Sequence, residues 1–134
     1  MRVVLDTNVL ISAFISRGVC RQVFEQCALH HELISSEELL SELKEKLTTK
    51  FRYSDQDVAA VAGLVQARTQ FVVPVSLKEP VCRDPDDDIV LATASAGDAI
   101  CIVTGDEDLL VLKQFQNIDI IRPKDFGQYE AERI

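Results

Sequence analysis

The sequence lacks the features that several common sites and membrane segments require. No apolar run in its 134 residues approaches the ~20 residues that span a bilayer. The four cysteines have no C-x-x-C spacing, and the two histidines, His30 and His31, are adjacent on one segment. These patterns disfavour a zinc site and a Ser/His/Asp triad. No P-loop, G-x-G-x-x-G motif or nucleophile elbow is present, so these routes to chemistry are also disfavoured.

An excess of positive charge is also missing. The net charge is −8, which does not suggest a protein that wraps nucleic acid with a basic surface. Lys44, Lys46, Lys50 and Arg52 form a local basic cluster, but for such a cluster alone a solvated helix face is the favoured interpretation. The amino terminus has no signal-peptide pattern, because Asp6 interrupts the first apolar run. We therefore expect a cytoplasmic protein without a membrane segment.

Length and hydrophobic patterning predict one domain over residues 1–134 with an α/β fold. Short apolar runs predict strands at 2–5, 31–34, 71–75, 100–103 and 118–121. Helical spacing and caps predict helices at 9–15, 18–29, from Ser35, from Ser54, at 84–97 and at 107–112, with a short terminal helix. Because strands alternate with helices throughout, the sheet is expected to be largely parallel.

Two helix starts and one helix face can be specified more closely. Ser35 with Glu38 matches a capping box, and Ser54 with Asp57 marks the next start. The apolar face of the helix after Ser54 is expected to include Val58, Val61, Leu64 and Val65.

Acidic residues recur where predicted strands end. Asp6 follows the apolar strand 2–5, and Asp106 follows the strand 100–103 with only Thr104 and Gly105 between. In open α/β sheets, sites form at the carboxyl ends of the strands, which share one edge. Each acid alone fits a helix cap as well as a ligand. Their joint placement favours a site for hard divalent cations, because gathered carboxylates repel one another unless cations neutralise them.

Two further acids lie on helices. Asp88 lies about one turn inside a helix that is otherwise nearly all apolar, and its side chain is expected to lean towards the strand-end edge. A partly buried acid needs a partner or must lose its charge. The neighbouring Asp87 is a second candidate ligand. Glu42 lies beside the leucine stripe of its helix, so its phase gives a weak preference for the buried side.

Five segments in order carry a resemblance to a known family. They are Val-Leu-Asp-Thr-Asn-Val-Leu-Ile-Ser-Ala at 4–13, Ile-Ser-Ser-Glu-Glu-Leu-Leu-Ser-Glu-Leu at 34–43, Arg-Asp-Pro-Asp-Asp-Asp-Ile-Val-Leu-Ala-Thr-Ala at 83–94, Val-Thr-Gly-Asp-Glu-Asp-Leu-Leu at 103–110, and Ile-Ile-Arg-Pro-Lys-Asp-Phe at 120–126. With these motifs the chain resembles PIN-domain proteins. Within that superfamily it resembles the toxin components of bacterial and archaeal toxin–antitoxin systems, the VapC-like ribonucleases.

The resemblance implies a three-layer α/β/α fold and a metal-dependent endoribonuclease that uses Mg²⁺ or Mn²⁺ to hydrolyse RNA phosphodiesters. It places Asp6, Glu42, Asp88 and Asp106 in the catalytic, metal-binding site. The supporting residues are Asn8, Thr104, Asp108 and Asp87. Candidate phosphate contacts on the RNA are Lys44, Lys46 and Arg52.

The resemblance also implies a cognate antitoxin as partner, and it is compatible with a homodimer. One alternative is a non-catalytic PIN-like module whose role is to bind a protein. A weaker alternative is a metal-dependent phosphatase, or a nuclease acting on DNA, at the same site.

Overall fold

A computed structural model describes residues 1–133, and Ile134, the last residue of the domain expected from the sequence, lies outside the described residues. In this part of the chain the strands are β1 (Arg2–Leu5), β2 (Glu32–Ser35), β3 (Thr69–Phe71), β4 (Cys101–Val103), β5 (Gln114–Phe115) and β6 (Ile118–Ile121). The helices are α1 (Thr7–Ile15), α2 (Val19–His30), α3 (Glu37–Thr49), α4 (Asp55–Arg68), α5 (Pro85–Ala96), α6 (Glu107–Leu110), the 3₁₀ turn η1 (Pro123–Asp125) and α7 (Phe126–Ala131). No helix among the described residues is long and apolar enough to cross a membrane.

The described strands form one sheet in the order β3-β2-β1-β4-β6-β5. Every neighbouring pair is parallel except β5 with β6, which is antiparallel. The central strands β1 and β4 pair directly, with Leu5 opposite Val103. The carboxyl ends of these two strands therefore meet at the middle of one sheet edge.

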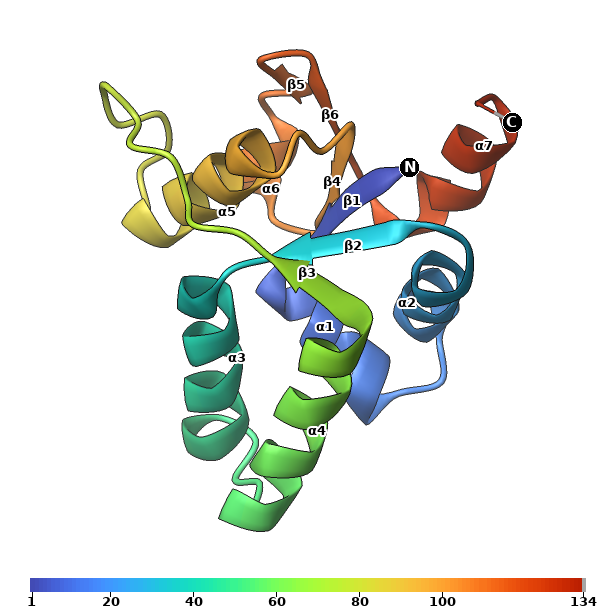
Figure 1. The fold of residues 1–134 in the computed structure, drawn as a ribbon, viewed down its shortest axis with the longest axis vertical. Coiled ribbons are helices and arrows are strands. Elements are labelled where there is room, and N and C mark those ends of the chain that lie inside the picture. Colours follow the sequence, from blue (N-terminus) through green and yellow to red (C-terminus); the bar gives the residue numbers. More distant parts are fainter. Residues whose placement is uncertain (134) are drawn as a thin grey trace.

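Helices cover both faces of the sheet (Figure 1). Side chains alternate across a strand, so Val3 and Leu5 of β1 pack into one core with α1, α2, α3, α4 and α7, while Val4 packs into the other with α5 and α6. Because both faces are covered, the central strands β1 and β4 are apolar at every position after Arg2, the first residue of β1. The three-layer α/β/α architecture predicted from the sequence, with its largely parallel sheet, is confirmed.

Several predicted boundaries differ from the structure. Strand β3 covers 69–71 instead of 71–75, and residues 72–84 that follow it contain no helix or strand. Strand β2 extends to Ser35, so Ser36 caps α3, accepting a hydrogen bond from the backbone amide of Leu39 at 3.4 Å. Leu64 was expected on the buried face of α4, but 50% of it is exposed. The expected cap at Ser54 is present and accepts from the amide of Asp57.

The start of α5 agrees with its sequence signals. Asp84 is the N-cap, and its side chain accepts a hydrogen bond from the amide of Asp86 at 2.9 Å. Pro85 follows at the first helical position, where its missing N–H costs no hydrogen bond. Gly97 ends the helix. This helix places Asp87 and Asp88 in its first turn, beside the sheet edge where β1 and β4 end.

Candidate active site

Asp6 is held at the end of β1 by contacts with β4 and α1. Its amide donates to the carbonyl of Val103 at 3.0 Å, which continues the pairing of the strands. Its carboxylate caps α1 by accepting from the amide of Thr7 at 2.7 Å, and it also accepts from the hydroxyl of Thr104 at 2.7 Å. The residue is only 5% exposed. Asp6 is therefore a helix cap and also a buried acid at the strand edge.

Burial is the main reason why the pKa of Asp6 is raised above its ordinary value. Hydrogen bonds from Thr104 and Thr7 favour the charged form and oppose this rise, whereas the nearby carboxylates of Glu42 and Asp106 add to it. A cation beside Asp6 would reverse the balance, because an opposite charge stabilises the carboxylate.

Two threonines link the neighbouring acids to Asp6. The hydroxyl of Thr7 donates to the carboxylate of Glu42 on α3 at 3.3 Å. The hydroxyl of Thr104 accepts from the amide of Asp106 at 3.0 Å while it donates to Asp6. Both threonines are fully buried. A continuous series of contacts therefore runs from Glu42 through Asp6 to Asp106.

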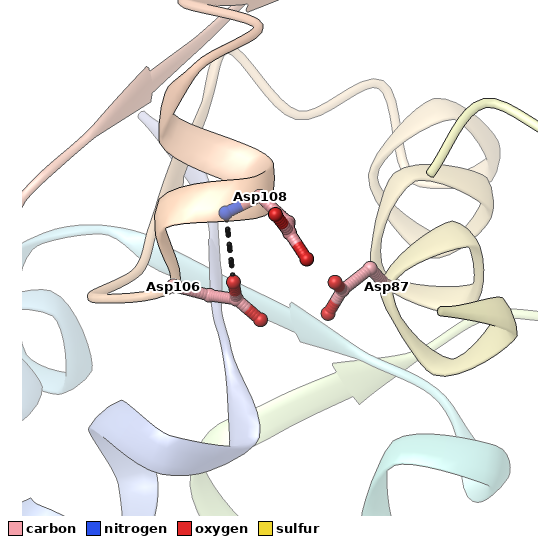
Figure 2. Close-up of side chains that lie close together, drawn as sticks. All are labelled: Asp87, Asp106 and Asp108. Carbon is pink, nitrogen blue, oxygen red and sulfur yellow. Dashed lines mark hydrogen bonds between the residues drawn. The ribbon is translucent and has the colours of Figure 1, made fainter. Parts of the chain in front are cut away.

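Asp87, Asp106 and Asp108 form the tightest group of acids in the described part of the chain (Figure 2). One carboxylate oxygen of each lies within 4.8 Å of the others. Asp106 caps the short helix α6 by accepting from the amide of Asp108 at 2.9 Å. Asp87 approaches from α5 and is only 7% exposed. We call Asp6, Glu42, Asp87, Asp106 and Asp108 the acid cluster.

The environment of Asp87 is strongly unfavourable for negative charge. Burial raises its pKa to about 7, and a hydrogen bond with Asp106 and the charges of Asp106, Asp6 and Asp84 contribute to the rise. Among the described residues, no Lys or Arg forms an ion pair with Asp87 or Asp6. Neither of these two buried carboxyl groups is therefore directly paired with a cation in this part of the chain, although the charge of Asp6 contributes to the raised pKa of Lys46.

Asp88 does not face the acid cluster. Its carboxylate accepts hydrogen bonds from the backbone amides of Val81, at 3.1 Å, and Cys82, at 2.8 Å. Consecutive helical residues point about 100° apart, so Asp87 and Asp88 cannot both face the same group. The structure thus brings together Asp6, Glu42 and Asp106 of the four acids expected from the sequence, and it places Asp87 where Asp88 was expected.

The basic residues expected to contact RNA are placed differently from one another. The ammonium group of Lys46 pairs with Glu42 at 2.9 Å and donates to Asn8 at 3.4 Å. Burial lowers the pKa of Lys46, but the hydrogen bond and charge of Glu42 outweigh this effect and raise it. Lys44 is two residues from Glu42 and so faces away from it on the helix, while Arg52 lies beyond the end of α3. Only Lys46 of these three contacts the acid cluster.

Two contacts at this edge were not anticipated from the sequence. Arg83 donates to the carboxylate of Asp108 at 2.6 Å, and the hydroxyl of Thr7 orients Glu42. Arg83 lies in an irregular segment with no periodic pattern, so only its position before Asp84-Pro85 could have drawn attention to it. In the sequence, Thr7 is accounted for by its position at the start of a helix, so its hydrogen bond with Glu42 could not be inferred.

Comparison with known proteins identifies the family of this chain. The model of the PIN domain family matches residues 2–108. The chain belongs to the PIN domain family. No curated protein matches its sequence. Among solved structures, it is similar to a chain in the crystal structure of VapBC2 from Rickettsia felis bound to a DNA fragment from their promoter.

The similarity to that VapBC2 chain has a TM-score of 0.66 and covers 91% of this chain and 98% of the other. The two sequences are 15% identical, so the likeness concerns the fold. The PIN domain match covers Asp6, Glu42, Asp87 and Asp106, and it ends at Asp108. All members of the acid cluster therefore lie in the part of the chain that defines its family.

Proposed function

We propose that this PIN domain is a metal-dependent endoribonuclease and the toxin component of a toxin–antitoxin pair. The observation that carries this proposal is the convergence of carboxylates from α5 and α6 to within 4.8 Å, beside the buried Asp6. Among the residues that the structure describes, neither Asp87 nor Asp6 forms an ion pair with a Lys or Arg. Such an arrangement suits a bound cation better than a purely structural role.

The donor set fits Mg²⁺ or Mn²⁺. Carboxylate oxygens are the ligands that these hard ions prefer, and Mg²⁺ needs few of them because it retains several waters. Asp6, Asp87 and Asp106 are the proposed ligands, with Glu42 and Asp108 as further members of the site. The raised pKa of Asp87 supports this choice, because a bound cation would stabilise its charged form. When bound, the ion would supply a water of lowered pKa and neutralise charge on the phosphate.

The residues of the chain would prepare this site in three ways. Thr104 holds the carboxylate of Asp6 and the backbone of Asp106 in fixed positions. Thr7 and Lys46 hold Glu42 from two sides. Lys46 also provides a positive charge at the edge of the acid cluster, where an RNA phosphate has to approach a protein of net charge −8. We propose it as a phosphate contact.

The partner is proposed from the family and from the similar structure. That structure contains VapBC2 with promoter DNA, and a toxin of this family would pair with a cognate antitoxin protein. A short open reading frame for a DNA-binding protein immediately upstream of the gene would support the pairing. A homodimer is compatible with the same role.

The proposed activity is tested by incubating purified protein with single-stranded RNA in Mg²⁺, in Mn²⁺ and in excess EDTA. We expect endonucleolytic cleavage that EDTA abolishes and either ion restores. Equal cleavage in EDTA would exclude the metal mechanism. No cleavage with any ion, together with no Mn²⁺ binding by calorimetry, would favour the non-catalytic protein-binding module. Parallel assays with DNA and with a phosphate monoester distinguish the other two alternatives.

A further inference from the structure

Asp88 connects the start of α5 to the irregular segment that precedes it. Its carboxylate accepts from the amides of Val81 and Cys82, which are seven and six residues earlier in the chain, respectively. Residues 72–84 contain no helix or strand, so these backbone amides have no regular partners. Two bonds to one charged acceptor are among the stronger hydrogen bonds in proteins. Asp88 therefore fixes the conformation of the chain just before Arg83.

Arg83 is the next residue after this fixed pair of amides, and it reaches across to the acid cluster. Its guanidinium donates to Asp108 at 2.6 Å, while 86% of its side chain is exposed. A guanidinium has five N–H donors, so this single bond leaves donors free at the surface. An ion pair this exposed contributes little stability. Exchanging Asp108 for another anion would therefore cost little.

Within residues 1–133, Arg83 and Lys46 are the basic residues that form ion pairs with the acid cluster, and they bind different ends of it. Lys46 pairs with Glu42, and Arg83 pairs with Asp108. Hydrogen bonds through Thr7, Asp6, Thr104 and Asp106 connect these two ends. A sugar–phosphate backbone crossing the acid cluster would meet a positive charge on each side.

We propose that Arg83 binds a phosphate of the RNA beside the acid cluster and that Asp88 is a positioning residue for it, acting through the amides of Val81 and Cys82. The substrate part of this inference rests on the proposed ribonuclease function. Arginine suits the task, because its planar fork of donors matches two phosphate oxygens. In this assignment Asp88 holds no metal ion, although it adjoins Asp87 in the sequence.

The positioning role is tested without any substrate. Amide hydrogen exchange of Val81 and Cys82 is measured by NMR in wild type, Asp88→Asn and Asp88→Ala. We expect strong loss of protection in Asp88→Ala and partial loss in Asp88→Asn, whose carboxamide oxygen still accepts one bond. Calorimetry with Mn²⁺ should give affinities within about twofold of wild type for both variants. Unchanged exchange, or a tenfold loss of Mn²⁺ affinity with normal exchange, would overturn the positioning role.

The phosphate contact is tested by steady-state cleavage of single-stranded RNA at several salt concentrations. For Arg83→Gln we expect KM to rise about tenfold with little change in kcat, as for a group that binds substrate in the ground and transition states alike. The dependence of log(kcat/KM) on log[salt] should become shallower by about 0.7, which corresponds to one lost contact with a single strand. Arg21→Gln, which removes an equal charge from α2, is the matched control and should keep the wild-type slope.

Asp88→Ala should reproduce the kinetic changes of Arg83→Gln, and the double variant should be no worse than either single one, because both act on one contact. A wild-type KM and salt slope in Arg83→Gln, with active wild-type protein, would overturn the phosphate contact and leave the ribonuclease function intact. An inactive wild type in Mg²⁺ and Mn²⁺ would reject the function and the phosphate contact together. The exchange measurements decide the role of Asp88 in either case.

Discussion

Asp87 and Asp88 are consecutive residues of α5, but their carboxylates have different partners. Asp87 lies within 4.8 Å of the carboxylates of Asp106 and Asp108, whereas Asp88 is bonded to backbone amides of the preceding segment. Asp87 thus lies close to other negative charges, whereas Asp88 accepts hydrogen bonds from N–H donors. Burial and the nearby acids raise the pKa of Asp87 to about 7. This contrast assigns the two residues to separate tasks.

Replacing Asp6 by Asn should separate catalysis from stability. We expect RNA cleavage to be lost, because the variant removes a charged ligand of the proposed ion. The metal-free melting temperature should be unchanged or raised, since a buried carboxylate near Glu42 and Asp106 is replaced by a neutral group. Asn is also a good N-cap. Thermal melting with and without Mg²⁺ provides the check, and the rise caused by Mg²⁺ should be smaller than in wild type.

A suitable control for this experiment is Asp98→Asn, which removes one exposed acid after the other end of α5. It should keep wild-type cleavage and the wild-type response to Mg²⁺. Wild-type activity in Asp6→Asn, with an undiminished Mg²⁺ effect, would reduce Asp6 to a helix cap.

The titration of Asp87 should lower the stability of the metal-free protein as the pH rises from about 4 to about 7. In this range the folded state keeps a proton on Asp87, whose pKa is raised to about 7, while the unfolded chain releases it near the ordinary aspartate pKa of 3.8. Stability falls with pH wherever the folded state binds more protons. The Asn side chain is neutral at every pH, so Asp87→Asn should lose less stability than wild type between pH 5 and 8. The difference should be on the order of 2 kcal/mol.

Urea unfolding in EDTA at these two pH values measures the effect. Asp86→Asn, on the exposed side of the same turn, is the matched variant and should retain the pH dependence of wild type. If Asp87→Asn and Asp86→Asn show the same pH dependence of stability, the pKa of Asp87 is not raised in the folded protein. Adding Mg²⁺ at pH 8 should stabilise wild type more than Asp87→Asn.

Gly97→Ala should destabilise the protein because of one close contact. A Cβ atom at this position would lie 2.4 Å from Cγ2 of Ile34, a buried β-branched side chain that cannot move aside easily. Overpacking of this kind typically costs about 1–3 kcal/mol. Gly63→Ala is the control: nothing lies within 4 Å of its Cβ position in the middle of α4, so it should stabilise by about 0.5–1 kcal/mol. Chemical unfolding of both variants measures the two changes in the free energy of unfolding, which should have opposite signs.

The sequence predicted the layers and the main edge of the site because these follow from strong local signals. Buried strands such as 101–103 read as continuous apolar runs, and Asp84-Pro85 marks a helix start without ambiguity. Asp6 follows such a strand directly, and Asp106 follows another after two intervening residues. Their proximity depends only on β1 and β4 being neighbours in the sheet, which they are.

The errors arose where tertiary contacts decide between adjacent positions. From the helical pattern alone, Asp88 is a better candidate than Asp87 to face the sheet edge. The partners that bind Asp88 lie in residues 72–84, however, which have no periodic pattern. Ser35 and Ser36 are equally good caps, and the length of β2 selects Ser36. Strand β5 has only two residues. It turns into β6 through Gln116 and Asn117, which both have positive φ angles, without the Asn-Gly pair that usually marks such a hairpin.

The hydrogen bond between Asp6 and Thr104 joins residues 98 positions apart in the chain. A ribosome that has reached residue 100 has already made Asp6 and Glu42, but neither Thr104 nor Asp106. At that stage β1 lacks its neighbour β4 and presents an unpaired edge. Contacts so distant in sequence form late, because closing a long loop must precede them. The nascent chain therefore has no assembled acid cluster until Asp106 and Asp108 have been made.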